Sequence, residues 1–339
     1  MTDFLMYIEN LDNAKRKDMP DWIEPMLAKL THDHFEGEDW YFERKLDGER
    51  VLAFIDGKGN VALYSRNQKM INESYPEIVE TLEENCNIPM ILDGEVVAFN
   101  EDNISDFQKL QPRMHVNDRK ESLDSDIEVY YYIFDCPYAQ NHDLSECEIQ
   151  QRKKFLKNNI NWTDPLRFCK HWRGNGIEHY KSACKKGWEG LIAKKADSKY
   201  VHTRSSKWLK FKCIKQQEFI VVGFTEPEGE RKGFGALLIG YYDEGKLVYS
   251  GEVGTGFDDE FLQDFRDKLD NIRIDKSPLD RGEPEKKNTH FVEPKYVCEV
   301  TFTEWTSSNK LRHPSFKGLR RDKKPEDVHK EDKNQIAEM

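Results

Sequence analysis

The order of secondary-structure patterns along the chain changes near residue 216, and this change restricts the fold more than any other feature. Before it, apolar strand patterns alternate with segments of helical period such as residues 75–86. After it, short strand patterns follow one another, with a single helical pattern at residues 258–269. A chain of 339 residues is also long for one compact core. We therefore predict an α+β domain of antiparallel sheets and helices at 24–216 and a small β-barrel at 217–328.

The two ends of the chain and its composition add broad limits. Residues 1–23 are predicted to form a short N-terminal extension, and residues 329–339 a charged, frayed tail. A hydrophobic content of 37%, a charged content of 34% and a net charge of -11 are typical of a soluble, highly charged protein. No apolar run approaches the ~20 residues of a membrane span. Seven scattered cysteines without a C-x-x-C pair indicate a reducing compartment, so we expect a cytosolic protein without membrane contact.

A strand pattern leads into the charged segment ERKLDGER, residues 43–50, which has Lys45 near its centre. Most lysines in charged runs are simply solvated. Here the lysine follows a strand and precedes Gly48, which would permit the close approach of a ligand. A lysine nucleophile must be neutral, whereas a free lysine has a pKa of ~10.4, so cations and desolvation would have to lower the pKa of Lys45. The hypothesis of a nucleophilic lysine therefore requires further basic residues from elsewhere in the chain.

Such residues occur in HTRSSKWLKFKCIK, residues 202–215, a segment rich in Lys and Arg and free of acids. If WLKFK is a strand, Lys210 and Lys212 point to the same face, because side chains alternate with period two. Two ammonium groups on one face favour an anion between them, and a triphosphate would fit. The alternative is an exposed, basic edge strand.

Carboxylates next to glycines are the third group of candidate site residues. Asp93 and Glu95 lie in LDGEVVAF, and Glu189 lies in WEGLIAKK. Isolated carboxylates of this kind are usually turn residues. Beside a phosphate-binding lysine pair they become candidate ligands for Mg²⁺, which prefers oxygen donors and commonly bridges phosphates.

These segments occur in the order of the motifs of one enzyme family. KLDGER (45–50) resembles the K-x-D-G-x-R motif of ATP-dependent DNA ligases, and RHPSFKGLRRDKK (312–324) contains an R-x-D-K sequence like that of their C-terminal motif. The intervening motifs are similar to SRN (65–67), LDGE (92–95), YYYIFD (130–135), EGLIAKKADSKY (189–200) and WLKFK (208–212). The resemblance covers about residues 24–328 and is strongest to the ligase domain of bacterial non-homologous end-joining ligases and their stand-alone relatives. It implies a nucleotidyltransferase (adenylation) domain followed by an OB-fold barrel.

The resemblance also implies a role for each matching residue. Lys45 would be the catalytic nucleophile that carries AMP. The other nucleotide-binding residues would be Glu43 at the adenine amino group, Phe134 against the adenine face, Arg50 and Glu95 at the ribose or phosphate, Arg66 at the ribose, and Arg204, Lys210 and Lys212 at the α-phosphate. The metal ligands for Mg²⁺, for which Mn²⁺ would substitute, would be Glu189, Glu95 and Asp47. Pyrophosphate would be oriented by Arg320, Asp322 and Lys323, and DNA would be contacted by Arg66, Lys207 and Arg312.

The implied reaction is the ATP-dependent sealing of 5′-phosphate/3′-hydroxyl breaks in duplex DNA, through lysyl-AMP and DNA-adenylate, in DNA repair. The implied substrates are ATP and nicked or broken duplex DNA, and a Ku-like end-binding protein is a candidate partner. We expect a monomer in the cytoplasm, at the nucleoid. Two alternatives stay open: another covalent nucleotidyltransferase, such as an RNA ligase or a capping guanylyltransferase, and a catalytically inactive DNA-end-binding module.

Overall fold

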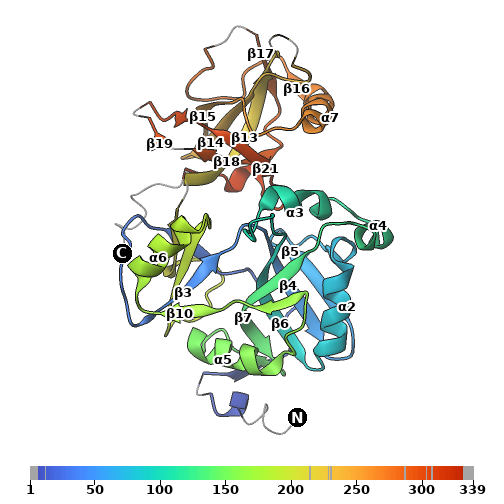
Figure 1. The fold of residues 1–339 in the computed structure, drawn as a ribbon, viewed down its shortest axis with the longest axis vertical. Helices are drawn as coiled ribbons and strands as arrows, with labels where there is room; N and C mark the ends of the chain where they lie inside the picture. Colours follow the sequence, from blue (N-terminus) through green and yellow to red (C-terminus); the bar gives the residue numbers. More distant parts are fainter. Residues whose placement is uncertain are drawn as a thin grey trace. The chain divides into compact units, whose positions relative to one another are not determined.

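The computed structural model describes residues 7–11, 13–213, 215–227, 229, 231–285, 288–302, 304–306 and 308–330. This part of the chain forms two compact units, the first ending at Cys213 and the second beginning at residue 214 (Figure 1). Most of the predicted tail, residues 331–339, lies outside the described residues. Among the described helices, none is long and apolar enough to cross a membrane.

The first unit contains two sheets of mainly antiparallel strands. One is seven-stranded, in the order β1 (Lys15–Arg16), β8 (His142–Asp143), β7 (Tyr130–Ala139), β6 (Pro89–Val97), β4 (Glu49–Asp56) and β5 (Val61–Ser65), with β9 (Leu166–Phe168) parallel to β7. The other is five-stranded, in the order β10 (His171–Arg173), β3 (Trp40–Lys45), β11 (Gly190–Lys195), β12 (Arg204–Lys212) and β2 (Leu27–Leu30).

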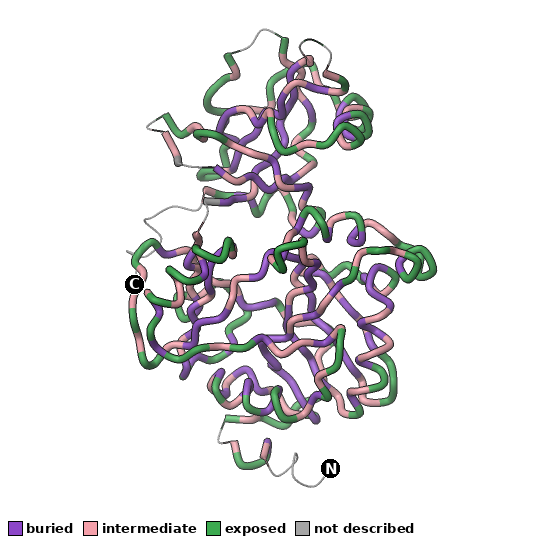
Figure 2. Tube along the Cα trace, in the orientation of Figure 1, coloured by how far each residue is buried: buried purple, intermediate pink, exposed green. Residues whose placement is uncertain are grey.

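Helices cover these sheets and close their cores. They are η1 (Asn72–Ser74), α2 (Pro76–Asn85), α3 (Phe107–Met114), α4 (Arg119–Leu123), α5 (Ile149–Asn159) and α6 (Gly176–Lys185). The larger core joins the seven-stranded sheet to apolar residues of α2, α3 and α5, including Leu82, Phe107 and Phe155. A smaller core places Ala183 of α6 against Phe42, Leu191 and Phe211 of the five-stranded sheet. Figure 2 shows buried residues concentrated along the strands of each unit.

The turn after Lys45 connects the two sheets, because β3 belongs to the five-stranded sheet and β4 to the seven-stranded one. Gly48 in this turn packs so closely that a Cβ would lie 2.1 Å from the carbonyl oxygen of Val96 in β6. The packing of this turn against β6 therefore accounts for the glycine, where the sequence suggested the approach of a ligand.

The N-terminal residues are more than an extension, contrary to the prediction for residues 1–23. Ile8 is fully buried in the larger core. Lys15 and Arg16 pair with Asp143 and His142 of β8, which makes this segment the edge of the seven-stranded sheet.

The second unit is a curled antiparallel sheet with one long helix. It consists of β13 (Lys215–Thr225), β14 (Leu237–Asp243), β15 (Lys246–Val253), α7 (Asp259–Asp270), β16 (Arg273–Ile274), β17 (Thr289–Val292), β18 (Val297–Phe302), β19 (Glu304–Trp305), β20 (Leu311–Arg312), β21 (Ser315–Leu319) and η2 (Pro325–Asp327). The long strand β13 pairs with β14, β17 and β18, and the sheet packs on an apolar core to which α7 contributes Leu262, Phe265 and Leu269. This architecture agrees with the predicted OB-fold.

A disulfide joins Cys184 in the last turn of α6 to Cys213, the last residue of the first unit. The other five cysteines are buried free thiols. The scattered cysteine pattern did not predict this bond, and a disulfide is not expected in the reducing compartment that the pattern indicated. It fastens the chain just after Lys212 to the helix that covers the five-stranded sheet.

We expect this bond to stabilise the first unit. It closes a loop with a sequence separation of 29 residues, for which loop-closure entropy gives about 3–4 kcal/mol. Calorimetry should show that a dithiol reductant lowers the Tm of the wild-type protein. The Cys184→Ser/Cys213→Ser variant should start from the lowered Tm and show no response to reductant, since its five remaining thiols are already free. An equal response of both proteins to the reductant would assign the effect to another site.

Candidate active site

The central residues of the site lie in rows across three neighbouring strands. In β11, Gly190 is opposite Lys45 of β3 and Lys212 of β12. Two residues further on, Ile192 is opposite Glu43 and Lys210. Because side chains alternate along a strand, these residues share one face of the sheet. The predicted common face of Lys210 and Lys212 is confirmed, and Lys45 and Glu43 lie on the same face.

Gly190 allows this arrangement. Its φ of +153° is unusual for other residues, and a Cβ there would lie 1.9 Å from the carbonyl oxygen of Phe211. Within the row, therefore, no side chain stands between Lys45 and Lys212. The opposite face of the same strands is apolar and packs against α6.

Lys45 forms an ion pair with Glu189, the residue immediately before β11. Both side chains are largely buried, at 18% and 6% exposed. Burial alone would lower the pKa of Lys45, and the charge of Lys212 acts in the same direction, but the Glu189 carboxylate outweighs them and raises the pKa above its ordinary value. The lysine is therefore held as an ammonium ion in this conformation, whereas the nucleophile hypothesis requires a lowered pKa.

The Glu43 carboxylate is buried and holds two lysines. It lies 2.6 Å from Nζ of Lys153 in α5 and 2.7 Å from Nζ of Lys194 in β11, and all three side chains are 2% exposed. Burial would raise the pKa of Glu43, but the two ammonium groups outweigh it and the pKa is lowered. To form the predicted hydrogen bond with an adenine amino group, the Glu43 carboxylate would have to accept from the base and from its lysine partners at the same time.

Arg50 is fixed by Asp93 rather than being free in the site. Its guanidinium donates to both Asp93 oxygens, one of them at 2.6 Å, and Tyr200 donates to the same carboxylate at 2.7 Å. Asp93 is fully buried within β6, so the suggestion that it lies at a turn and binds a metal is wrong. The Arg50 guanidinium lies 4.4 Å from the centroid of the Phe134 ring, and Nζ of Lys194 lies 4.1 Å from it. The two sheets therefore meet at Phe134.

The remaining predicted residues of the first unit are placed as follows. Glu95 is directly opposite Arg50 in the β4–β6 pairing. Asp47 is buried and accepts a hydrogen bond from the backbone N–H of Phe107 at 3.3 Å, at the start of α3, so in this conformation it serves the fold. Arg66 follows β5, outside the rows. Arg204 donates to the carbonyl oxygen of Ala28 at 2.8 Å, and Lys207 is exposed on β12.

The R-x-D-K residues form a network inside the second unit. Arg320 donates to both oxygens of Asp322, at 2.8 and 2.7 Å, and to Glu299 at 2.9 Å. Asp322 is 3% exposed, and although burial would raise its pKa, the Arg320 charge lowers it. Lys323 pairs with Glu218 at 3.1 Å. Arg312, on β20, is exposed.

Two functional partners were missed from the sequence, Lys153 and Lys194. Lys194 was detectable, because it lies two residues after Ile192 on β11 and must share the face of Gly190. Lys153 was not, because it is one of three lysines in the α5 segment QRKKFLK and nothing in the sequence shows which of them reaches Glu43.

Comparison with known proteins gives both units the same relatives. The model of the ATP dependent DNA ligase domain matches residues 25–212, and that of the ATP dependent DNA ligase C terminal region matches residues 230–323. A mycobacterial DNA ligase D solved as a complex with ATP and MES is 31% identical, with a TM-score of 0.66, and the match covers 91% of this chain and 98% of that one.

The curated relatives are longer proteins. The multifunctional non-homologous end joining protein LigD of Pseudomonas aeruginosa is 37% identical over 317 residues, which are 91% of this chain and 37% of the relative. The corresponding protein of Mycobacterium tuberculosis is 34% identical over 92% of this chain and 40% of its own length. A DNA ligase of Thermococcus onnurineus is 32% identical over 90% of this chain and 57% of its own length. The chain thus spans roughly two fifths of the LigD proteins, and with family models matching both units it belongs to the ATP-dependent DNA ligase family.

Proposed function

We propose that this chain seals 5′-phosphate/3′-hydroxyl breaks in duplex DNA with ATP, through a covalent AMP adduct on Lys45. The observation that carries this proposal is the row Lys45–Gly190–Lys212, with Glu189 in contact with Lys45. It places one buried lysine beside a second lysine and a carboxylate, on a sheet face whose central position has no side chain. This is the arrangement that an attacking amine, an α-phosphate and a counter-charge require.

The first step is attack by the Lys45 amine on the α-phosphate of ATP, which forms a P–N bond and releases pyrophosphate. Lys212 and Lys210 lie on the same face and would stabilise the negative charge that develops on the phosphate. The amine must first lose a proton. Burial and the Lys212 charge favour that loss, and Glu189 opposes it.

The residues around Lys45 fit a metal ion that is shared with phosphate rather than one held in a cage of side chains. Among the described residues, no group of three or more His, Cys, Asp or Glu could hold a metal, and Mg²⁺ commonly binds one or two carboxylates plus phosphate oxygens. Glu189 is the carboxylate in place for this role, while Glu95 is a further candidate and Asp47 is engaged at α3. A bound Mg²⁺ would neutralise phosphate charge and take the Glu189 carboxylate from Lys45.

The nucleoside would lie where the two sheets meet. Phe134 would stack on adenine, Glu43 would accept from the adenine amino group, and Arg50 would contact ribose or phosphate. The Arg50 guanidinium and Lys194 already lie within 4.4 Å of the Phe134 ring centroid, so a base at this ring would replace one of two cations. Arg66 would contact the ribose first and the 5′-phosphate of the DNA later.

The later steps transfer AMP from Lys45 to the 5′-phosphate of a break, and the 3′-hydroxyl then attacks that phosphate and releases AMP. Lys207 and Arg312 are exposed and would contact the DNA backbone, and Arg204 at the start of β12 would support the phosphate site. Lys323 would orient pyrophosphate during the first step. Arg320 and Asp322 bind each other, so we assign them the task of holding the segment that carries Lys323.

The relatives named for non-homologous end joining support a role in DNA repair. We propose that the protein acts on broken duplex DNA in the cytoplasm, at the nucleoid, as a monomer or beside a Ku-like end-binding protein. In a reducing cytoplasm the Cys184–Cys213 bond would be open to reduction, because neither cysteine is fully buried.

Incubation with α-labelled ATP tests the proposal. The wild-type protein should acquire labelled AMP on Lys45, and labelled GTP should leave no adduct. Lys45→Ala should form no adduct yet still seal a nick that is supplied already adenylated, because Lys45 is needed only as the first nucleophile. An adduct from GTP would point to a capping enzyme instead, and wild-type protein that forms no adduct would be an inactive end-binding module.

Glu189 should control the protonation of Lys45. In Glu189→Gln the carboxylate that raises the pKa of Lys45 is gone, so the pH profile for acylation of Lys45 by an amine reagent should move to lower pH. Adenylation at saturating Mg²⁺ should nevertheless slow by ~10²-fold, because the carboxylate that would hold Mg²⁺ beside the phosphate is lost. Glu178→Gln, an exposed acid on α6, is the matched control and should change neither result. An unchanged acylation profile in Glu189→Gln would contradict the assignment.

The R-x-D-K residues should divide into a catalytic and a structural group. Lys323→Ala should slow lysyl-AMP formation by ~10-fold or more in single-turnover assays, while the sealing of a pre-adenylated nick should change little, because no pyrophosphate leaves in that step. Asp322→Ala should instead destabilise the second unit by about 3–5 kcal/mol, since it leaves the buried Arg320 without its main partner. Equal losses in both steps for Lys323→Ala would show that this lysine supports the barrel or binds DNA.

A further inference from the structure

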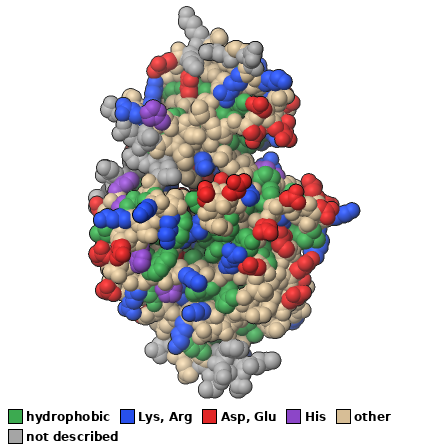
Figure 3. Space-filling model, viewed as in Figure 1, with side chains coloured by type: hydrophobic (Ala, Val, Ile, Leu, Met, Phe, Trp, Pro, Cys, Tyr) green, Lys and Arg blue, Asp and Glu red, His purple; other side chains and the backbone are tan. Residues whose placement is uncertain are grey.

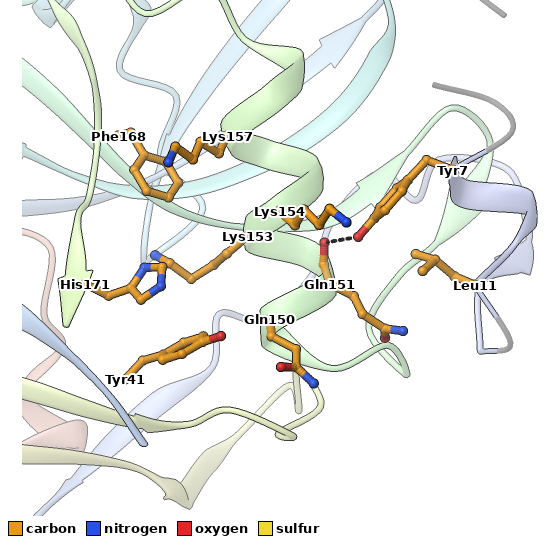
Figure 4. Close-up of a pocket in the computed structure, with 10 residues that line it drawn as sticks. All are labelled: Tyr7, Leu11, Tyr41, Gln150, Gln151, Lys153, Lys154, Lys157, Phe168 and His171. Atoms are coloured by element: carbon orange, nitrogen blue, oxygen red, sulfur yellow. Dashed lines mark hydrogen bonds between the residues drawn. The ribbon is translucent and has the colours of Figure 1, made fainter. Parts of the chain in front are cut away.

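A cavity lies beside the Glu43 network, away from Lys45. Its volume is about 550 Å³, and it is lined by Tyr7, Leu11, Tyr41, Gln150, Gln151, Lys153, Lys154, Lys157, Phe168 and His171 (Figure 4). Tyr41 and Lys45 are four residues apart on the same face of β3, a distance of about 13 Å along the strand. Between them stands Glu43, which does not line the cavity itself but forms an ion pair with Lys153, a residue that does.

The cavity is basic in a protein whose net charge is -11. None of its lining residues is an acid. The charge of Lys153 is opposed by Glu43, but that carboxylate already serves Lys194 as well. Lys154 and Lys157 form no ion pair with any acid in the part of the chain that the structure describes, and the nearby Glu148 is occupied by the capping box of α5 and by Gln150. The positive charge of this surface is therefore not balanced locally.

The protonation state of His171 is consistent with this positive charge. Its pKa is lowered to about 4, mainly by burial; the charges of Lys153, Lys194 and Lys157 act in the same direction, and Glu43 opposes them. His171 is thus neutral at physiological pH. Its Nδ1 is buried and has no hydrogen-bond partner among the described residues. The cavity consequently offers the Nδ1 atom of His171 as well as the ammonium groups of Lys154 and Lys157.

Aromatic rings complete the lining. The rings of Tyr41 and His171 lie 4.2 Å apart, and Phe168 packs 6.4 Å from His171. Tyr7 lies on the other side of α5, where its hydroxyl donates to the carbonyl oxygen of Gln151 at 3.1 Å and Lys154 lies 5.5 Å from its ring. Aromatic faces beside lysines are the combination that binds bases and phosphates of single nucleotides, and the volume is within the range of small-molecule sites.

We propose that this cavity binds a nucleoside monophosphate, either free or at the 5′ end of a DNA strand. In Figure 4 Lys157 extends toward Phe168 and Lys154 toward Tyr7, so these two exposed lysines bind its phosphate by turning their side chains toward each other, while Tyr41, Phe168 and His171 contact its base. Figure 4 shows Lys153 extending from α5 toward His171, which makes Lys153 the link between the occupant of this cavity and Glu43. The site is separate from the row of Lys45, and its existence does not depend on the proposed ligase reaction.

Lysine protection locates the binding site independently of Lys45. The wild-type protein is treated with an amine-acetylating reagent in the presence of AMP, ribose 5-phosphate, inorganic phosphate or the 5′-phosphorylated dinucleotide pdTdT, and each lysine is read by mass spectrometry. AMP or pdTdT should protect Lys154 and Lys157 but not Lys181 and Lys185, exposed lysines of α6 that serve as internal controls. Protection by pdTdT alone would identify the ligand as a strand end, and protection by AMP alone would identify it as a free nucleotide.

The remaining comparisons test the two halves of the proposal. AMP should protect at a concentration about tenfold lower than ribose 5-phosphate, because stacking of the base contributes to binding. Lys154→Gln/Lys157→Gln should weaken the binding of AMP to this site about tenfold or more, whereas Lys181→Gln/Lys185→Gln should leave it unchanged. For the variants, in which the probe lysines differ, binding is followed through the NMR signals of His171.

Three results would overturn the proposal: no protection by any probe at millimolar concentration, equal protection of the α6 lysines, or equal potency of AMP and ribose 5-phosphate. Formation of the Lys45 adduct is measured on a separate, unacetylated portion of the same protein, incubated with α-labelled ATP and Mg²⁺. Protection of Lys154 and Lys157 without a Lys45 adduct would refute the ligase reaction but support this binding site. A Lys45 adduct without protection would support the ligase reaction but refute this binding site.

Discussion

The buried carboxylate of Glu43 is the interaction on which the first unit's site depends. It joins three elements, because β3 carries it while its partners Lys153 and Lys194 come from α5 and β11. An ion removed from water costs several kcal/mol unless it is paired, and removing one partner of a buried pair typically costs about 3–5 kcal/mol. The three elements therefore cannot separate cheaply. Since Lys45 lies two residues from Glu43 on the same face of β3, this network also fixes where Lys45 lies.

Glycines then set how closely the strands of the site approach. Gly190 and Gly48 each face a backbone carbonyl oxygen that any side chain would strike, because a Cβ at these two positions would lie only 1.9 and 2.1 Å from it. The first keeps the row between Lys45 and Lys212 open, and the second holds the turn after Lys45 against β6. Sequence reasoning assigned the motif glycine to ligand approach. The structure shows that its own backbone packing accounts for it.

The periodicity of apolar residues predicted most of the fold. The patterns at α2 and α7 were recognisable because their apolar residues repeat at helical spacing. Alternation also predicted that Lys210 and Lys212 share a face. What periodicity could not supply was the neighbour across the sheet: Asp93 was taken for a metal ligand because nothing local shows that Arg50 lies beside it. The Cys184–Cys213 bond and the ion pair of Lys153 with Glu43 also join residues that are far apart in the sequence, so periodicity could not predict them either.

The cations that the motifs single out in each of the two units share a property that explains why motif spacing alone could not define their roles. Lys45 is paired with Glu189, Arg50 with Asp93, and Lys323 with Glu218. On the face shown in Figure 3, both acidic and basic side chains occur on each unit. Such pairs keep each cation ordered without a ligand, which lowers the cost of organising the site when a phosphate arrives.

The same pairing makes nucleotide binding an exchange of partners. A triphosphate gains little from a lysine that already has a carboxylate unless that carboxylate finds another cation. Glu189 is the position where this matters most, because its carboxylate opposes both the phosphate charge and the loss of the Lys45 proton. A divalent cation bound by Glu189 would relieve both conflicts, because it would neutralise the phosphate charge and draw the carboxylate away from the Lys45 ammonium. The proposed role of Mg²⁺ thus rests on the carboxylate that pairs with Lys45 in this structure.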